Sequence, residues 1–355
     1  MTKRLLVLFA ALFGAALFFC GCSRKPVLHV YIWCDYLAPE LISQFEQENN
    51  CRVQIDIFDS NEMMFSKLQA GGTGYDLICP SHYFVQKMAK LGLITRLDHS
   101  RISTFGNISP AIVDKLGPDI TNYAVPYLMS YTGLGYNRKA VPQLATDPTW
   151  EVFARTDLKG YMTLLDDYSE VLGAAMLACG LTQADLDDPA MGDTNLRKVL
   201  DKILTWRDNV VKFENEQYKN GLASGEFSVV MGYASDLNQI VANDPENLAF
   251  TMPKEGCLLS CDMLSIPATA PNPELAYKFL EFLHRPESAV KTIQEIHAYC
   301  PNSPAEKLLP QALKEDESIF IKTDIIDRSE FVKELSPEDE ERHLAIWNKV
   351  KAGEE

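Results

Sequence analysis

The chain has 355 residues, of which 46% are hydrophobic, and its formal net charge at pH 7 is −16. This hydrophobic content excludes a disordered chain, and the length is enough for two domains with a sizeable core. An acidic surface repels nucleic acid, so the charge argues against a nucleic-acid-binding protein and favours small cations as ligands.

The first residues predict a signal peptide that ends in a lipidation site. Two basic residues precede an apolar run at 5–19, which is shorter than the about 20 residues of a membrane-spanning helix. A small residue then precedes Cys22, and this ending resembles a bacterial lipoprotein box. We therefore expect a signal peptide at 1–21, a lipid on Cys22 and a domain tethered to a bacterial membrane outside the cytoplasm. The alternative is a secreted, cleaved protein without lipid.

Seven cysteines remain after the signal peptide, and an odd number cannot pair completely within one chain. They are scattered, without a C-x-x-C motif, and most lie in apolar, strand-like surroundings. These features favour buried free thiols. Cys257 and Cys261 are the pair to test first for a bridge.

The first predicted strand ends in a cluster of polar and aromatic side chains. Residues 27–33 are mostly β-branched, aromatic or leucine, which is typical of a strand, and Trp33, Cys34, Asp35 and Tyr36 stand at its carboxyl end. In open α/β sheets the ligand binds beyond the carboxyl ends of the strands. The cluster therefore predicts part of a ligand site, although two aromatic residues by themselves also suit the edge of a core.

Strands and helices alternate after this point, which predicts a parallel sheet covered on both faces. Asp59 with Glu62 is expected to form a capping box at a helix start. Ser81 and Tyr83 follow the third strand. The expected elements are helix 38–49, strand 52–58, a helix that ends at Gly71, strand 75–79 and a helix that ends at Gly92.

The pattern loosens at 119–139, where we expect the chain to cross from one lobe to the other. A second α/β set follows, and its strands at 161–165 and 227–231 also end in polar residues. Those residues are Asp167, Glu170, Tyr233 and Asp236, and Asp262 lies on the segment 253–265 that returns the chain. The remaining expected elements are helices 194–209, 216–223, 273–283 and 286–297, strand 248–252 and an acidic helix near the end.

The strand ends share aromatic rings, carboxylates and hydroxyls, and His82 is their only basic residue. A site for an anion needs basic groups or a helix terminus. An alkylammonium group is instead held by carboxylates, by hydroxyl acceptors and by aromatic faces along its methylenes. The strand ends therefore predict a site for an organic cation.

Other uses of these acids stay open at this point. Residues 166–170 also suit a helix start, where acids complement the helix dipole, or a hard cation, although no calcium-loop pattern is present. A pair of carboxylates is also what glycoside hydrolysis needs, but the chain lacks G-x-S-x-G, H-E-x-x-H, phosphate-loop and dinucleotide motifs. The six histidines have no mutual metal spacing. We expect no enzyme, no metal site and no cofactor.

The chain resembles the extracytoplasmic polyamine-binding proteins, of the spermidine/putrescine-binding type, of bacterial ABC transporters. The segments that carry the resemblance span about residues 28–300 and are YIWCDYLAPELISQFEQE, FDSNEMMFSKLQAGGTGYDLICPSHYFV, VPYLMSYTGLGYN, FTMPKEGCLLSCDMLSIPA and AYKFLEFLHRPE. The resemblance implies an α/β, two-lobed periplasmic binding protein fold (type II-like), with the ligand in the interlobe cleft. Lobe 1 would comprise 27–135 and 256–303, and lobe 2 would comprise 136–255 and 304–355.

The resemblance also implies roles for individual residues. Trp33 matches a tryptophan that covers the aliphatic chain of the ligand, and Asp167 with Glu170 matches an acidic pair that receives amines. Tyr233 stands where the family usually has a second tryptophan. The ligand-binding residues implied in this way are Trp33, Cys34, Asp35, Tyr36, Ser81, Tyr83, Asp167, Glu170, Tyr233, Asp236, Asp262 and Tyr299.

Three positions bear on the choice between putrescine and spermidine. Asp35 and Asp236 agree with the putrescine-preferring branch of the family. Ser260 stands where the spermidine branch places another tryptophan. We therefore expect a monomeric, lipid-anchored receptor that prefers putrescine and delivers it to an ABC transporter permease. The alternatives are a signalling or adhesion lipoprotein for another amine, and an acid-pair hydrolase.

Overall fold

The computed structural model describes residues 25–353 except 73, 317 and 321–326. The predicted signal peptide and Cys22 lie outside the described residues. In the described part of the chain, no helix is both long enough and apolar enough to cross a membrane.

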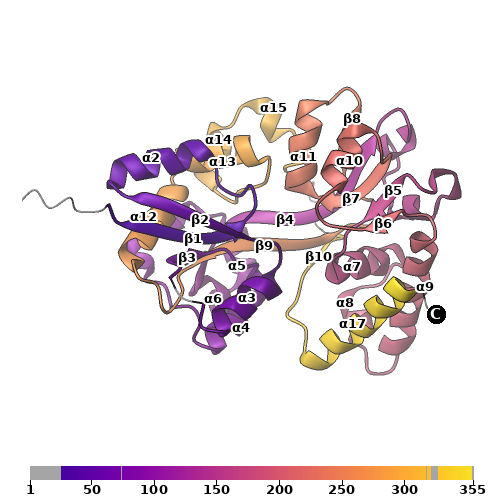
Figure 1. Ribbon diagram of the computed structural model, residues 1–355, viewed down its shortest axis with the longest axis horizontal. Coiled ribbons are helices and arrows are strands. Elements are labelled where there is room, and N and C mark those ends of the chain that lie inside the picture. The colour runs from indigo at the N-terminus through magenta and orange to yellow at the C-terminus, as the bar shows by residue number, and fades with distance from the viewer. Residues whose placement is uncertain (1–24, 73, 317, 321–326, 354–355) are drawn as a thin grey trace, which may run out of the picture.

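The structure has two lobes, and the chain visits the first of them twice (Figure 1). The first visit consists of β1 (Val27–Trp33), α2 (Pro39–Asn49), β2 (Arg52–Phe58), α3 (Asn61–Gln69), β3 (Leu77–Ile78), α4 (His82–Lys90), α5 (Pro110–Leu116) and α6 (Pro118–Thr121). After the second lobe, the chain returns through β9 (Leu258–Ser265) to α12 (Pro273–Leu283), α13 (Pro286–Ile296), α14 (Ser303–Leu308) and α15 (Gln311–Lys314).

The second lobe is entered through β4 (Ala124–Asn137). Its elements are β5 (Met162–Leu164), α7 (Tyr168–Ala178), α8 (Gln183–Leu186), α9 (Gly192–Arg207), β6 (Lys212–Phe213), α10 (Tyr218–Ser224), β7 (Val229–Tyr233), α11 (Ala234–Asn243) and β8 (Leu248–Thr251). The tail adds β10 (Glu330–Phe331) and α17 (Pro337–Ala352). Most predicted elements are thus confirmed to within a few residues.

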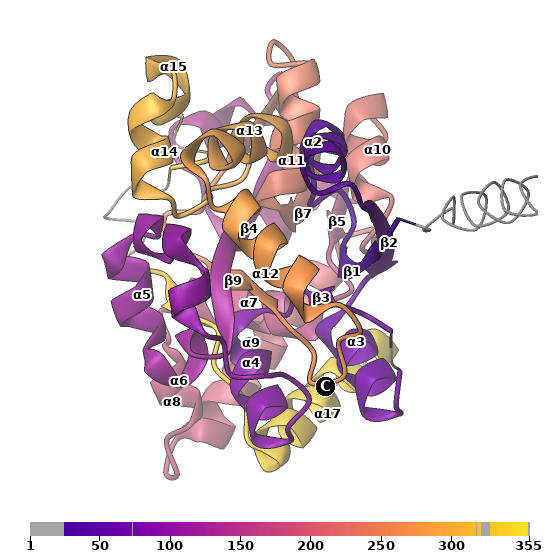
Figure 2. The same cartoon turned by 90° about the vertical axis from the view of Figure 1, so that its left-hand side faces the viewer.

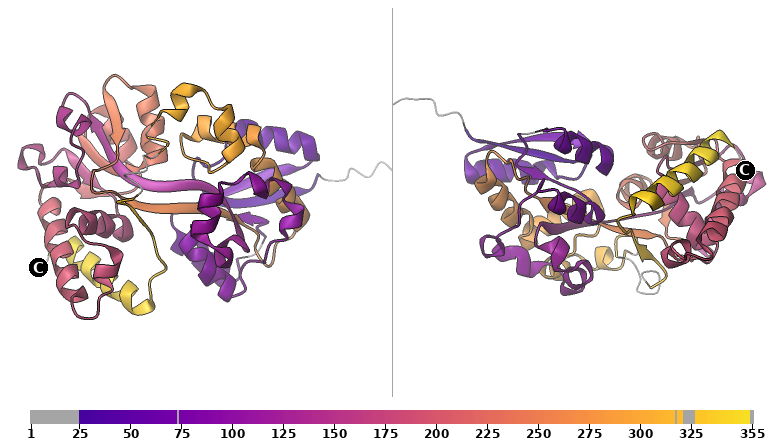
Figure 3. Two further views of the ribbon diagram at one scale, coloured as in Figure 1. Left: turned by 180° about the vertical axis from the view of Figure 1, so that it is seen from behind. Right: turned by 90° about the horizontal axis from the view of Figure 1, so that it is seen from below.

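The strands of both lobes form one sheet with the order β2-β1-β3-β9-β4-β7-β5-β6, to which β8 and β10 add at the side. The two ends of this order are parallel, as the alternation of strands and helices predicts. At one end β1 pairs with β2 and β3, and at the other end β5 pairs with β6 and β7. Antiparallel pairing joins them in the middle through β4 and β9. Seen from behind, β4 in magenta and β9 in orange run side by side between the lobes (Figure 3).

The expected irregular crossing at 119–139 is wrong in one respect, because most of it is a single long strand. The first part of β4, from Ala124 to Tyr131, pairs with β9, and the part from Thr132 to Asn137 pairs with β7 and β8. Every backbone group of a buried segment needs a hydrogen-bond partner, and three neighbouring strands supply the partners here. One strand thereby belongs to both lobes.

Alternate residues of β1 point into two cores of the first lobe. Leu28, Val30 and Ile32 pack with α2, α12 and α13, whereas Tyr31 packs with α3 and α4 on the other face. Figure 2 shows α2 and α13 in the upper part of the view and α3 and α4 in the lower part. The sheet of this lobe is therefore covered on both faces.

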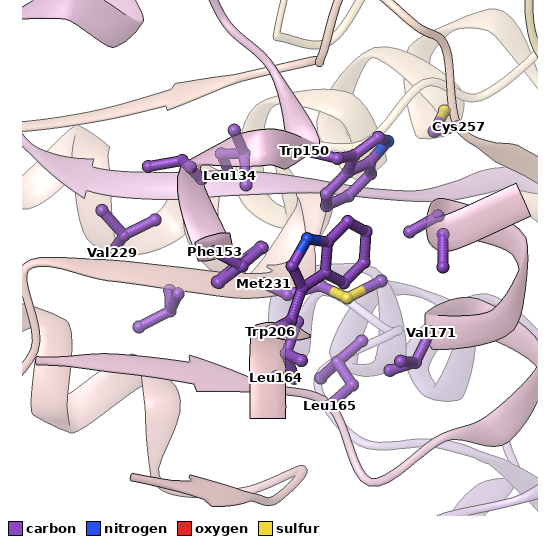
Figure 4. Packing of buried hydrophobic residues seen from close by; sticks show 14 of the residues in the cluster. Leu134, Trp150, Phe153, Leu164, Leu165, Val171, Trp206, Val229, Met231 and Cys257 are labelled. Carbon is purple, nitrogen blue, oxygen red and sulfur yellow. The ribbon is translucent and has the colours of Figure 1, made fainter. Parts of the chain in front are cut away.

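The core of the second lobe is built around Trp150, Phe153 and Trp206, none of which is exposed (Figure 4). Phe153 packs beside both indoles, and its ring centroid lies 6.4 Å from that of Trp150 and 5.8 Å from that of Trp206. The Nε1 of Trp150 donates a hydrogen bond of 2.9 Å to the backbone oxygen of Gly256, which ties this core to the segment before β9.

The tail divides between the lobes. Residues 304–355 are expected in lobe 2, and Trp347 and Val350 of α17 do pack in that core. Ala305, Leu309 and Ile319, in contrast, pack in the core of the first lobe, because α14 follows α13 closely and stays beside it. The exact lobe boundaries stay a prediction.

Two local expectations differ from the structure. Ser60 rather than Asp59 caps α3, and its side chain accepts a hydrogen bond of 3.1 Å from the Met63 amide. The strand expected at 75–79 is reduced to β3.

Among the described residues, all seven cysteines are free, so Cys257 and Cys261 form no bridge. Both side chains are buried on or next to β9.

Candidate functional site

A cavity of about 370 Å³ lies between the lobes, at the carboxyl ends of the parallel strands. Ten of the twelve predicted site residues line it, and they come from both lobes. These ten are Trp33, Cys34, Tyr36, Ser81, Tyr83, Asp167, Glu170, Tyr233, Asp236 and Asp262. Their role in binding a ligand stays a prediction, but the structure does bring them together.

Asp262 is the most deeply buried acid of the cavity, with 2% of its surface exposed. Its carboxylate accepts hydrogen bonds from the Tyr36 hydroxyl at 2.8 Å and from the Ser81 hydroxyl at 2.6 Å. Burial raises the pKa of Asp262 to about 6, although both hydroxyls favour the charged form. A cation beside Asp262 would therefore replace the lost hydration of the carboxylate.

Asn61 holds two of the predicted residues in place and was not predicted itself. Its Nδ2 donates to the hydroxyls of Ser81 and Tyr83, each at 3.0 Å, and its Oδ1 accepts from the Ser81 amide at 3.0 Å. The sequence did contain a sign of a site residue here, because Asn61 stands just after the carboxyl end of the strand 52–58. Residues 59–62 were predicted only as the start of a helix.

A second pair of acids, Asp167 and Glu170, stands at the start of α7. Asp167 caps this helix by accepting from the amides of Ser169 at 3.0 Å and Glu170 at 3.2 Å, and it also accepts from the Tyr233 hydroxyl at 3.0 Å. The helix-start interpretation of the acid cluster is thus confirmed, and the same capping side chain also lines the cavity. Burial raises the pKa of Asp167.

Glu170 lies in the first turn of α7, three residues after Asp167, and is 9% exposed. Its Oε2 accepts a hydrogen bond of 2.8 Å from the hydroxyl of Thr132 in β4. Burial, and then the negative charge of Asp167, raise the pKa of Glu170 to about 8. Thr132 was missed because it lies inside a strand, where the sequence carries no sign of a site.

Asp236 differs from Asp262, Asp167 and Glu170 because it already has a cationic partner. Its Oδ2 accepts from the Tyr218 hydroxyl at 2.5 Å and lies 3.4 Å from the Nζ of Lys219. Lys219 also lines the cavity, as do Lys87 and Lys333. These lysines were not among the predicted site residues, because the prediction considered only residues at or near the ends of strands.

The aromatic wall of the cavity is formed around Trp33. Its ring lies 4.4 Å from the ring of Phe58 and 6.4 Å from that of Tyr36, between centroids. The Nε1 of Trp33 and the Oγ of Ser260 are buried without a hydrogen-bond partner, and both residues line the cavity. Buried polar atoms of this kind are uncommon in the absence of a ligand or water.

Two predicted residues lie off the cavity. Asp35 turns the chain after β1 with a left-handed φ of 57°, a conformation that aspartate tolerates better than most residues. Tyr299 donates a hydrogen bond of 2.7 Å to Glu306. His82 is buried as well, and burial lowers its pKa to about 4, so it contributes no positive charge at neutral pH.

Comparison with known proteins agrees with this architecture. The family model for bacterial extracellular solute-binding proteins matches residues 40–321. The chain is 31% identical to the putrescine-binding periplasmic protein of Escherichia coli (strain K12) over 350 residues, which are 93% of either chain.

Two solved structures are similar over nearly their whole length. The spermidine/putrescine ABC transporter substrate-binding protein of Streptococcus pneumoniae has a TM-score of 0.80 and 28% identity, and the match covers 93% of this chain and 99% of that one. A lipoprotein of Treponema pallidum has a TM-score of 0.80 and 29% identity over 91% of this chain and 99% of that one.

The chain belongs to the bacterial extracellular solute-binding protein family and has the two-lobed fold of periplasmic binding proteins. This confirms the class of protein expected from the sequence. The family consists of solute-binding proteins of ABC transporters and not of enzymes, so the acid-pair hydrolase is set aside.

Proposed function

We propose that this protein is a polyamine receptor of an ABC import system and that the interlobe cavity binds the amine. The main support for this proposal is a set of three buried acids in the cavity, Asp262, Asp167 and Glu170. Among the described residues their side-chain partners are hydroxyl and amide groups rather than ammonium or guanidinium groups. Buried carboxylates of this kind are stabilised by a cation that the protein itself does not supply.

The arrangement of these acids favours a short diamine as the ligand. Asp262 lies in β9, whereas Asp167 caps α7 and Glu170 lies in the first turn of that helix, so two different elements supply one group of acids each. Two ammonium groups joined by methylenes would meet one group each, and the indole of Trp33 would cover the methylenes. The relatives support this chemistry, since one is named a putrescine-binding protein and another a spermidine/putrescine-binding protein.

We further propose that the receptor prefers putrescine to spermidine. Ser260 is 7% exposed and presents a small hydroxyl where a longer amine would gain from a large aromatic surface. Its unpartnered Oγ suits an ammonium donor.

Binding is tested by calorimetry of the purified domain with putrescine, spermidine, a sugar and a neutral amino acid. We expect both amines to bind, putrescine more tightly, and the other two compounds to give no heat. Heat from the sugar or the amino acid, with none from either amine, would overturn the polyamine assignment.

The amino-terminal part of the proposal is a lipid on Cys22 that anchors a monomeric receptor outside the cytoplasm, next to its permease. The lipoprotein among the similar structures supports it. The full-length protein should partition into detergent, and Cys22→Ala should move it to the aqueous phase. Unchanged partitioning of the variant would contradict lipidation at this residue.

A further inference from the structure

Three lysines line the cavity, and one of them, Lys219, is paired with an acid of the predicted site. The Nζ of Lys219 lies 3.4 Å from the Oδ2 of Asp236, and both residues line the cavity. Their side chains are 29% and 23% exposed, so the pair is largely shielded from water but lies nearer to it than Asp262. Asp236 joins Asp262, Asp167 and Glu170 as the fourth predicted acid that lines the cavity, and Lys219 neutralises it.

The helix that carries Lys219 gives no reason for a lysine at this position. Lys219 is the second residue of α10, where the positive end of the helix dipole disfavours a cation. The buried neighbour Tyr218 directs its hydroxyl to the same carboxylate oxygen at 2.5 Å. The two contacts hold Asp236 at the cavity wall and aim the Lys219 ammonium at it.

The pair lies next to the corner of the cavity that Asp262 occupies. The Cys34 thiol is within electrostatic reach of both Lys219 and Asp236, and the Tyr36 hydroxyl, which donates to Asp262, is within reach of Asp236. An amine that extends beyond Asp262 in this direction would meet the Lys219 ammonium instead of a free carboxylate.

We propose that Lys219 limits the length of the bound amine by occupying Asp236. The ligand is then a diamine, because a third ligand nitrogen that reaches Asp236 meets an acid already paired with Lys219 and is repelled by the lysine. This inference rests on the proposed polyamine function and adds the residue that decides between a diamine and a triamine.

The test compares Lys219→Met with the unmodified protein by calorimetry with putrescine and with spermidine. Methionine keeps most of the side-chain length and removes the charge, so Asp236 becomes free for the triamine. We expect the affinity for spermidine to rise roughly tenfold, and the affinity for putrescine to change by less than about threefold. Lys219→Arg keeps the charge and should preserve the original preference.

A double variant, Lys219→Met with Asp236→Asn, identifies the source of the gain. If spermidine uses the freed carboxylate, the second substitution removes most of the gain. Thermal unfolding of each variant checks the fold, and Lys219→Gln replaces Lys219→Met if the latter unfolds.

The outcomes separate this inference from the proposed function. If the unmodified protein binds putrescine but Lys219→Met changes both affinities equally, Lys219 contributes only general electrostatics and the inference is overturned. If the unmodified protein binds neither amine, the polyamine function itself fails.

Discussion

Glu170 is the side chain whose protonation a bound cation should change most. Its pKa of about 8 means that most copies carry a proton at pH 7, and an ammonium group nearby favours the charged form. Binding of putrescine should therefore release protons, and affinity should rise between pH 6 and pH 8. Calorimetry in buffers of different ionisation enthalpy measures the release. A value of zero at pH 7, with constant affinity from pH 6 to pH 8, would contradict this assignment.

The same group should lower the stability of the ligand-free protein at high pH. The pKa of Glu170 is raised above the unfolded value of 4.5, so the folded state binds more protons between pH 4.5 and about pH 8. Stability from this group therefore falls as pH rises through that window. Glu170→Gln removes the effect and should raise the melting temperature at pH 8 while weakening putrescine binding.

Glu226→Gln is a matched control, because Glu226 is exposed and lies off the cavity. It should change neither the melting temperature nor the affinity. If both variants behave alike, the effect of Glu170→Gln comes from overall charge rather than from a buried carboxyl group.

Trp33 should contribute through its ring face. Trp33→Ala removes the cation–π and packing contacts with the amine, which together are worth about 1–2 kcal/mol, so affinity should fall roughly tenfold. Trp33→Phe keeps a ring and should lose less. Equal affinity of Trp33→Ala and the original protein by calorimetry would remove Trp33 from the site.

At the scale of elements, the packing of α7 against β9 positions the acids. A Cβ on Gly173 of α7 would lie 2.3 Å from the Cδ1 of Leu258 in β9, far inside van der Waals contact. Gly173→Ala should therefore push the helix away from the strand, destabilise the protein by about 1–3 kcal/mol and weaken ligand binding. Urea unfolding measures the stability.

The matching control is a second substitution at the point of contact. Leu258→Ala by itself removes buried surface, but in combination with Gly173→Ala it also removes the clash. The double variant should lose less stability than the sum of the single losses. Strict additivity would mean that the clash is relieved elsewhere.

At the scale of the whole molecule, β4 and β9 are the strands shared by both lobes, and ligand binding should change the angle between the lobes. An amine that contacts acids on both sides favours a closed arrangement. Small-angle scattering should therefore show a smaller radius of gyration with putrescine than without it, and no change with a sugar. An unchanged radius at saturating putrescine would contradict closure.

The sequence alone was enough to predict the class of fold and ten of the residues that line the cavity. Strand periodicity located the carboxyl ends of the strands, and the rule that ligands bind there pointed to Trp33 at the end of β1 and to Asp167 after β5. Local patterns were enough where a side chain stands at or just after the end of a strand, because the backbone there fixes its position. Asp262 lies inside β9, and it was expected from the returning segment and from the family resemblance.

Only the tertiary structure decided which groups complete the cavity and which acids are free. Thr132 lies inside β4 and Lys219 near the start of a helix, so nothing in their own neighbourhood in sequence marks them, and Tyr299 lies off the cavity. The contact of Lys219 with Asp236 joins two helices, α10 and α11, through space. Charge pairing depends on distances between atoms rather than on residue type, and these distances exist only once the lobes have folded.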